Sequence, residues 1–334
     1  MISNLTNFQK KDRKILQVLE LDSRATISEI AKACGLSKSA TFSRLKNIEE
    51  SGIIDRYIIG VNYRALDYTH FRLYLKFSSM SGDFESEISR YLKSHGAVAW
   101  FSITQGEWDL IVRFLAKDTD EFGKYSGEFF AKFGKFVKSS AFTIAVSPAY
   151  HRCTQLTGNA GASSEDATLA KTDAVLSKSD FSILHSLFDN SRMPITELAG
   201  KAGISPEAAS YRIKRLRKLG IITSFYARFN RIKLGYMNMK ATLWLSDKGA
   251  KNALRKYCEA HEAVSFYSEM LGPWDFEIDF DVESIGRLHG ILLDLRAKFP
   301  QAISDYSVLA KVMETESNPF GRRALRKSSV PKSP

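Results

Sequence analysis

The sequence has few cysteines, no long apolar run and fewer acidic than basic residues. Its three cysteines, Cys34, Cys153 and Cys258, lie far apart without a CxxC pair or a cluster of histidines. This spacing argues against a disulfide framework or a structural zinc site. No run approaches the roughly 20 apolar residues that span a bilayer. The N-terminus turns polar within ten residues, so we expect no secretory signal, no membrane partner and a cytoplasmic protein.

The charge balance points to an anionic partner. Lysine and arginine number 48 against 37 acidic residues, which gives a net charge of +11. Such an excess favours DNA, RNA or an acidic surface, although an ordinary basic protein would share it. A length of 334 residues with 44% hydrophobic content allows two or more globular domains.

One stretch of the chain occurs twice. Residues 27–54 read ISEIAKACGLSKSATFSRLKNIEESGII, and residues 195–222 read ITELAGKAGISPEAASYRIKRLRKLGII, at a shift of 168 without a gap. Each copy predicts two short helices joined by a glycine turn, and an amphipathic helix is expected before each, at 8–20 and 177–188. Three helices in this order outline a helix-turn-helix.

The last helix of each copy has an apolar stripe and an opposite polar face. Because such a helix fits the major groove, its polar face predicts a DNA contact; a solvated face of a structural helix is the alternative. Residues 205–219 hold five basic residues and one acid, against three and two in 37–51, so the second helix should attract phosphates more strongly. The expected DNA-binding residues are Ser37, Lys38, Ser39, Phe42, Ser43, Arg44 and Lys46, and Ser205, Glu207, Ser210, Tyr211, Arg212, Lys214 and Arg215.

The remainder of each half is repeated as well. Extended runs at 53–61 and 221–229 predict a short ribbon or wing, whose arginines Arg56, Arg228 and Arg231 are either phosphate contacts or ordinary surface residues. Beyond them, periods of two and then of 3.6 residues alternate in the order β-α-β-β-α-β. The predicted fold is α+β: two winged helix-turn-helix domains, each followed by a ferredoxin-like βαββαβ domain, an α/β sandwich.

These patterns also predict the domain boundaries. Small polar residues without periodicity at 153–174 indicate a flexible linker, and the segment from Asn318 onward is basic, without acids. The expected order is a first helix-turn-helix domain at 1–62, a first ferredoxin-like ligand and dimerisation domain at 63–151, a linker at 152–176, a second helix-turn-helix domain at 177–230, a second ferredoxin-like domain at 231–316 and a basic disordered tail at 317–334.

Both halves resemble the Lrp/AsnC (feast/famine) family of transcription regulators. The resemblance is carried by the helix-turn-helix and by a G-x-[WY]-D turn, Gly106-Glu-Trp108-Asp109 in one half and Gly272-Pro-Trp274-Asp275 in the other. It implies sequence-specific DNA binding, dimerisation through the ferredoxin-like domains and further homo-oligomers. It also implies that small effectors, typically amino acids, bind between dimers near the glycine-aspartate turn.

The effector residues expected from this resemblance lie in the two turns. An aspartate there could accept hydrogen bonds from an ammonium group, and Pro273 would make the second turn the poorer binder because it lacks an N–H. The alternative is structural: glycine makes the turn, while aspartate and tryptophan fix the packing of the strands. The candidate residues are Thr104, Gly106, Trp108 and Asp109, and Gly272, Trp274 and Asp275.

A single chain with two complete units departs from the usual family layout. We expect the two ferredoxin-like domains to pair within the chain, because a linker of roughly 20 residues gives a millimolar-range effective concentration. Pairing between chains, which would give four DNA-binding heads, is the alternative. Since the halves differ in sequence, an asymmetric operator is expected.

Two other functions share this outline. Siroheme decarboxylases resemble the same family, but their histidine-asparagine-tyrosine and arginine-rich cluster is missing here, where 98–101 (VAWF) and 264–267 (VSFY) take its place. We also find no nucleophile-base pair or phosphate loop, so no catalytic residue, metal or cofactor is expected, and the protein is predicted not to be an enzyme. An architectural DNA-coating protein without an effector is the remaining alternative.

Overall fold

A computed structural model describes residues 10–146, 148–150, 165–166 and 174–320. The first unit comprises α1 (Lys10–Leu21), α2 (Ile27–Cys34), α3 (Lys38–Glu50), β1 (Ile54–Val61), η1 (Tyr63–Leu66), β2 (Thr69–Phe77), α4 (Gly82–Ser94), β3 (Val98–Gln105), β4 (Leu110–Ala116), α5 (Thr119–Phe133), η2 (Gly134–Phe136), β5 (Val137–Ala145) and β6 (Ala149–Tyr150). After β7 (Glu165–Asp166), the second unit comprises α7 (Lys178–Asp189), α8 (Ile195–Ala202), α9 (Pro206–Lys218), β8 (Ile222–Phe229), β9 (Met237–Leu245), η3 (Lys248–Ala250), α10 (Lys251–Ala260), β10 (Val264–Leu271), β11 (Phe276–Val282), α11 (Ile285–Lys298) and β12 (Ile303–Glu316).

The helix boundaries follow the capping residues of the sequence. Thr26 forms a capping box with Glu29 at the start of α2, and Ser177 forms one with Asp180 at the start of α7. Gly35 ends α2 with a φ of 61°, a left-handed conformation that costs glycine little. The predicted three-helix outline is confirmed in both units, and the fold class is confirmed with it.

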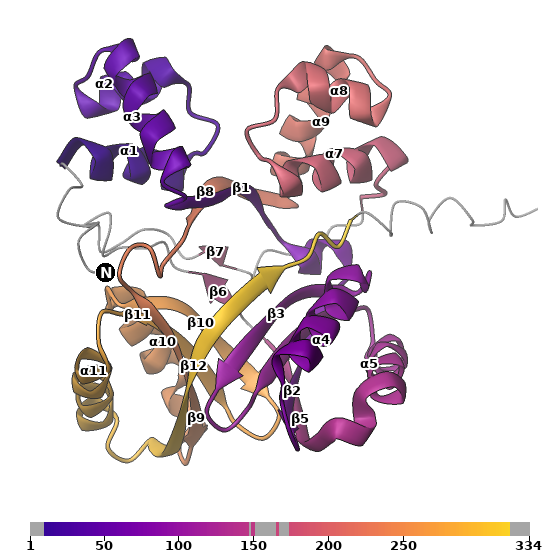
Figure 1. Ribbon diagram of the computed structural model, residues 1–334, viewed down its shortest axis with the longest axis vertical. Helices are drawn as coiled ribbons and strands as arrows, with labels where there is room; N and C mark the ends of the chain where they lie inside the picture. Colours follow the sequence, from indigo (N-terminus) through magenta and orange to yellow (C-terminus); the bar gives the residue numbers. More distant parts are fainter. Residues whose placement is uncertain (1–9, 147, 151–164, 167–173, 321–334) are drawn as a thin grey trace, which may run out of the picture.

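The two runs that follow the recognition helices pair with each other. Strand β1 is antiparallel to β8, and the pair Ile58 and Tyr226, which are equivalent in the repeat, marks a pseudo-two-fold axis. This β1–β8 ribbon joins the two helix-turn-helix domains (Figure 1). The predicted wing is therefore shared between the units, because backbone groups of a lone strand need a partner that its own unit does not supply.

The helix-turn-helix domains are also tied across this axis. Helix α1 packs on β8 of the other unit, and α7 packs on β1. The hydroxyls of Ser23 and Ser191, again equivalent positions, lie 2.6 Å apart. Arg24 donates to the carbonyl of Ser191, and Arg192 donates to that of Ser23. Both domains thus lie on the same side of the barrel described next (Figure 1).

The ferredoxin-like domains close into one barrel. The strand order is β5-β2-β4-β3 in the first unit and β10-β11-β9-β12 in the second. Strand β3 pairs with β12, and β10 pairs with β5 and β6, so the edges of the two sheets join at both seams. Closure removes the exposed edges that either sheet would have alone. The two domains therefore pair within the chain, as expected of a pseudo-dimer.

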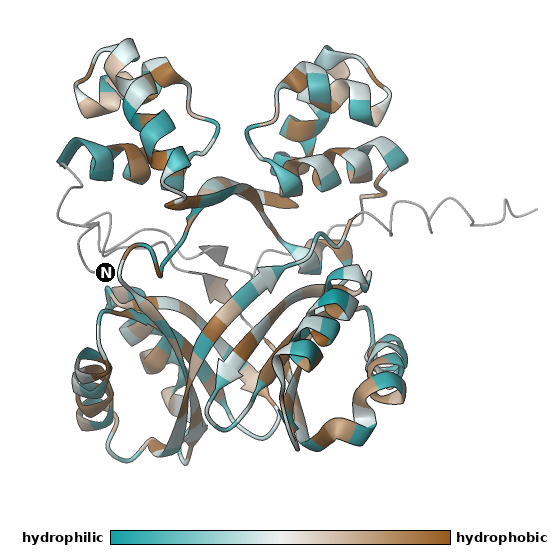
Figure 2. Cartoon of the chain, viewed as in Figure 1, coloured by the Kyte–Doolittle hydropathy of each residue, from teal (hydrophilic) through white to brown (hydrophobic). Residues whose placement is uncertain are grey.

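Each sheet buries both of its faces. Phe71, Leu73 and Leu75 of β2 pack against the outer helices, and these amphipathic helices show both colours in Figure 2. The alternate residues Arg72 and Tyr74 point into the barrel and are also buried. The closed barrel thus turns the polar face of β2 into an interior surface.

The segments between and after the two units differ in part from the prediction. Of the predicted linker, residues 151–164 and 167–173 lie outside the described residues, whereas β7 pairs with β6. The expectation that the tail is disordered from residue 317 is wrong at its start. Phe320 is buried against Tyr63 and Phe188, because burial removes the apolar surface of its ring from water. Asn318 donates to the carbonyl of His185. Residues 321–334 lie outside the described part.

Candidate nucleic-acid interface and effector turns

The polar face of α3 is exposed over its first turns. Lys38, Ser39 and Ser43 face solvent, and Phe42 keeps 59% of its surface exposed. Lys46 is exposed too and lies 3.7 Å from Glu50, one turn further along the helix. The exposed face of α3 thus presents an aromatic ring between two lysines.

The equivalent face of α9 is exposed and more basic. Tyr211 keeps 68% of its surface exposed, Glu207 and Lys214 face solvent, and Ser210 is half-buried. Position 218 is a lysine where the first unit has Glu50, so Lys214 has a like charge one turn away instead of a carboxylate.

Two of the predicted DNA-binding residues cap the recognition helices. The hydroxyl of Ser37 accepts a hydrogen bond from the N–H of Ala40 at 3.1 Å, and that of Ser205 accepts one from the N–H of Ala208 at 3.2 Å. Both serines remain exposed. Their capping bonds place the first turn of each helix at the surface.

The three arginines predicted to bind DNA are engaged within their own domain. Arg44 pairs with Asp12 of α1 at 2.9 Å, and Arg212 and Arg215 pair with Asp180 of α7 at 2.9 and 3.3 Å. Burial raises the pKa of Asp180, but the Ser177 hydrogen bonds and Arg212 lower it overall. These arginines hold the recognition helix on the first helix. The repeat carried the signal, because both copies keep the acid and the arginine at a spacing of 32 residues.

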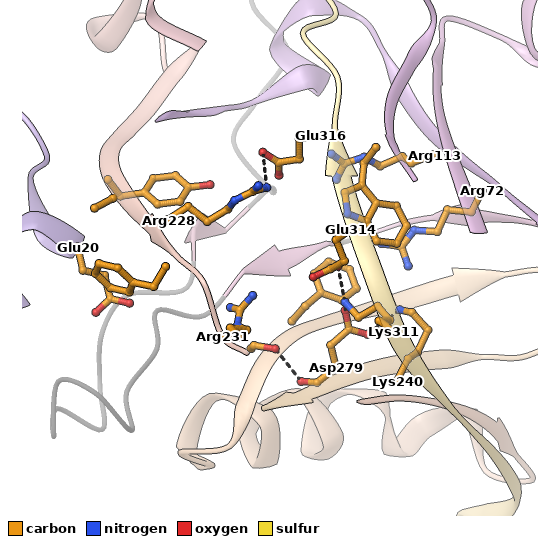
Figure 3. A pocket seen from close by; sticks show the side chains of 16 residues that line it. Glu20, Arg72, Arg113, Arg228, Arg231, Lys240, Asp279, Lys311, Glu314 and Glu316 are labelled. Atoms are coloured by element: carbon orange, nitrogen blue, oxygen red, sulfur yellow. Dashed lines mark hydrogen bonds and ion pairs between the residues drawn. The ribbon is translucent and has the colours of Figure 1, made fainter. Parts of the chain in front are cut away.

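The arginines of the β1–β8 ribbon also face protein. Arg56 lies 3.3 Å from Glu316, and Arg228 pairs with Glu316 and Asp55. Arg231 pairs with the buried Asp281. Figure 3 shows Arg228 facing Glu316 in the space between ribbon and barrel. The two expected roles were phosphate contacts and ordinary surface positions; the structure instead shows ion pairs within the chain.

The aspartates of both turns accept hydrogen bonds from the protein itself. Asp109 accepts from the N–H of Phe77 at 2.9 Å and from Lys76 at 2.7 Å. Asp275 accepts from the N–H of Leu245 at 2.9 Å and lies 3.1 Å from Lys248. Each aspartate thereby fastens the turn to the neighbouring strand.

The glycines of the turns lie against the other unit. Gly106 has a φ of 138°, and a Cβ there would lie 3.0 Å from the Cβ of Leu309. Gly272 has a φ of 152°, and a Cβ would lie 2.8 Å from Cγ2 of Thr143. Both turns therefore need glycine for its conformation and for the close approach of the second backbone.

The remaining turn residues pack in one buried cluster with residues of both units. The hydroxyl of Thr104 donates to the carbonyl of Trp108 at 2.7 Å, and both tryptophans are buried with their ring centroids 6.4 Å apart. Trp274 donates from its indole to Glu277. The geometry favours the structural alternative for these residues, and an effector contact there stays a prediction.

Sequence reasoning missed a network of buried charges in the barrel. Arg72 of β2 and Lys240 of β9, equivalent positions in the repeat, both pair with Glu277 of β11. Lys240 and Lys311 also pair with Asp279, each at 2.7 Å. Burial raises the pKa of Glu277, but Arg72 and Lys240 lower it overall. The signal was the alternation of charged and apolar residues in strands that were expected to be buried, such as FEIDFDV with its three acids.

Two absences concern only the described part of the chain. Within it, every helix is too short or too polar to cross a membrane. The same residues contain no group of three or more histidine, cysteine, aspartate or glutamate side chains placed to hold a metal ion.

Comparison with known proteins agrees with this geometry. A family model described as winged helix-turn-helix DNA-binding matches residues 8–55 and 176–223. The HTH-type transcriptional regulator FL11 of Pyrococcus furiosus is 28% identical over 114 residues, which is 34% of this chain and 74% of the relative. The HTH-type transcriptional regulator LrpA of Pyrococcus horikoshii is 42% identical over 60 residues, 18% of this chain and 43% of the relative.

Among solved structures, the siroheme decarboxylase NirDL has the same fold over nearly the whole chain. The match covers 96% of this chain and 99% of that one, with a TM-score of 0.63 and 13% sequence identity. At this identity the likeness shows the fold and no activity. The helix-turn-helix matches, the regulators similar in sequence and the duplicated G-x-W-D domains agree: this chain carries two winged helix-turn-helix units in tandem and is similar to regulators of the Lrp/AsnC type.

Proposed function

We propose that this protein is a sequence-specific DNA-binding transcription regulator of the Lrp/AsnC type, a pseudo-dimer that is not an enzyme. The observation that carries the proposal is the placement of two exposed recognition helices, α3 and α9, on the same side of one barrel. The relatives named as transcriptional regulators support it. One chain then presents two heads to one DNA duplex.

The recognition faces support an asymmetric operator. The exposed aromatic side chain is Phe42 in α3 and Tyr211 in α9, and these two positions differ by one residue in the repeat. The charge one turn after the equivalent lysines is negative in α3 and positive in α9. We therefore expect two half-sites of different sequence, with the stronger salt dependence in contacts made by α9.

Selection of bound sequences from a random DNA pool tests this proposal. We expect one asymmetric motif with two half-sites, and protection of discrete sites in footprinting. Phe42→Ala should relax the sequence preference at one half-site and Tyr211→Ala at the other. Lys298→Ala on α11 removes an exposed positive charge far from both heads and serves as the control. Uniform coverage without a motif would favour an architectural protein instead.

The whole-chain likeness to a siroheme decarboxylase favours an enzyme as the second candidate. The residues at the start of β3 and β10, 98–101 and 264–267, lack the histidines that the resemblance would require. Incubation of the protein with siroheme under reducing, anaerobic conditions separates the two candidates. Release of carbon dioxide by the parent protein would support the enzyme and contradict our proposal.

A further inference from the structure

Two cavities lie between the β1–β8 ribbon and the mouth of the barrel. The larger has a volume of about 300 Å³, and the smaller, shown in Figure 3, about 140 Å³. They lie on either side of the pseudo-two-fold axis and share Arg113, Tyr226 and Glu316. We call the larger one the ribbon cavity; its size is within the range of small-molecule sites.

The smaller cavity holds most of its charges in ion pairs within the protein. Lys311 lies 2.7 Å from Asp279 and 2.8 Å from Glu314, and Lys240 lies 2.7 Å from Asp279. Figure 3 shows Lys311 beside these carboxylates. A charged ligand would have to replace these ion pairs, so this cavity offers it little.

The ribbon cavity has a different balance. Arg113 and the exposed Arg64, which donates to the carbonyl of Val146 at 2.9 Å, line it. Its one carboxylate, Glu316, is paired with Arg56 and Arg228 from the ribbon. The wall therefore carries an excess of positive charge. A positive wall favours an anionic ligand, and an arginine guanidinium matches a carboxylate with two parallel hydrogen bonds.

His70 adds a polar group aimed at an absent partner. Its side chain is only 7% exposed, lines the ribbon cavity, and its Nδ1 has no hydrogen-bond partner. Burial, together with Arg113, Arg72 and Arg64, lowers the pKa of His70 well below its ordinary value, so the ring is neutral. A neutral imidazole can donate one hydrogen bond to a carboxylate.

The equivalent position in the second unit shows what such a site requires. Asn238 takes the place of His70 and donates to the carboxylate of Asp281 at 2.5 Å. Asp281 also pairs with Arg231. The first unit has Leu115 at the position of Asp281, so it supplies no carboxylate of its own to His70.

We propose that the ribbon cavity binds a small carboxylate ligand with an apolar body, and that this ligand is the effector. The carboxylate contacts Arg113 and His70, and the body packs on Ile58 and Ile144. The effector role rests on the proposed regulator function. Because the cavity has the β1–β8 ribbon as one wall and the barrel as the other, a bound ligand fixes the DNA-binding heads relative to the barrel.

Calorimetric titration of the full chain without DNA tests the site, with phenylacetate as the probe and phenylacetamide as its uncharged match. We expect one phenylacetate per chain and at least about ten-fold weaker binding of the amide, because the charge-assisted hydrogen bonds are lost. Arg113→Gln and His70→Phe, which removes the donor but keeps a ring, should each weaken phenylacetate binding by about ten-fold or more. Arg64→Gln, at an exposed position that tolerates change, should weaken it by a few fold.

Lys76→Gln is the control, because it changes the distant turn at Asp109 and should leave binding unchanged. Absence of phenylacetate binding, equal binding of the amide, or full binding by His70→Phe and Arg64→Gln would overturn the site. The effector role is tested separately by the affinity for the selected operator with and without phenylacetate. Ligand binding without any change in that affinity would overturn the role, whereas loss of DNA binding in the parent would overturn only the proposed function.

Discussion

The two units of this chain have the same backbone but differ where they meet. In the barrel interior the first unit contributes Arg72 and Arg113, whereas the second contributes Glu277 and Asp279 in the place of Ile111 and Arg113. Pairing the first unit with itself would bury arginines together, without those acids. The comparison teaches that the interior charges favour the pairing of unlike units, because a buried charge is stable only beside an opposite one.

Removing Glu277, the acid that two cations share, should have the largest effect on stability. Glu277→Ala takes away the carboxylate that Arg72 and Lys240 both contact, at a site fully shielded from water. We expect a loss of about 3–5 kcal/mol in the free energy of unfolding. Urea denaturation measures it. Glu50→Ala on the surface of α3 is the control and should change stability by about 0.5 kcal/mol or less.

The turns at the seams offer the next largest effect. Gly272→Ala would place a Cβ 2.8 Å from Thr143 and 2.9 Å from the carbonyl of Phe142, at a φ of 152°. We expect a loss of about 1–3 kcal/mol, and a similar one for Gly106→Ala. Gly127→Ala, in helix α5 with open space around it, should instead stabilise by about 0.5–1 kcal/mol. Equal midpoints for Gly272→Ala and the parent in thermal denaturation would show that the seam is not closely packed.

The recognition helices differ in charge, and mutation of two equivalent lysines measures how this difference affects DNA binding. Lys46 and Lys214 are equivalent, but Lys46 lies 3.7 Å from Glu50. We expect Lys214→Ala to lower the slope of log affinity against log salt concentration by about one, and Lys46→Ala by less. Fluorescence anisotropy with the selected operator gives both slopes. Equal slopes would mean that the two heads contribute alike. Arg212 and Arg215 suit this test poorly because they also hold Asp180.

The smallest effect concerns the pH dependence of stability. Because the pKa of His70 is lower in the folded state, the unfolded state binds more protons below about pH 6.5, and stability falls as the pH decreases. The contribution is at most about 1.4 kcal/mol per pH unit. His70→Asn should flatten the decrease between about pH 6.5 and 5. His261, whose pKa burial also lowers, remains in the variant and retains part of the slope. An unchanged slope would contradict a buried neutral His70.

The sequence was a good guide wherever structure is local. Helices α5 (Thr119–Phe133) and α11 (Ile285–Lys298) lie where the predicted β-α-β-β-α-β order has its second helix. Site residues were harder to assign, since a polar residue on a recognition helix can face DNA or the first helix. Lys214 and Arg215 are neighbours in sequence, yet the first faces solvent and the second faces Asp180. Side chains of neighbouring residues point about 100° apart around a helix axis, so small differences in packing decide which partner each side chain contacts.

By itself, the sequence determined the repeat, the helix caps, the β-α-β-β-α-β order and the likeness to Lrp/AsnC regulators. Each of these rests on neighbours within one turn or one strand, where spacing alone decides. Only the tertiary structure decided that β1 pairs with β8, that two sheets close into one barrel, and that His70 and Arg113 face the same cavity. These contacts join residues far apart in the chain. They depend on which strand edges and which buried charges pair with each other, and the spacing of residues within one helix or strand does not specify these pairings.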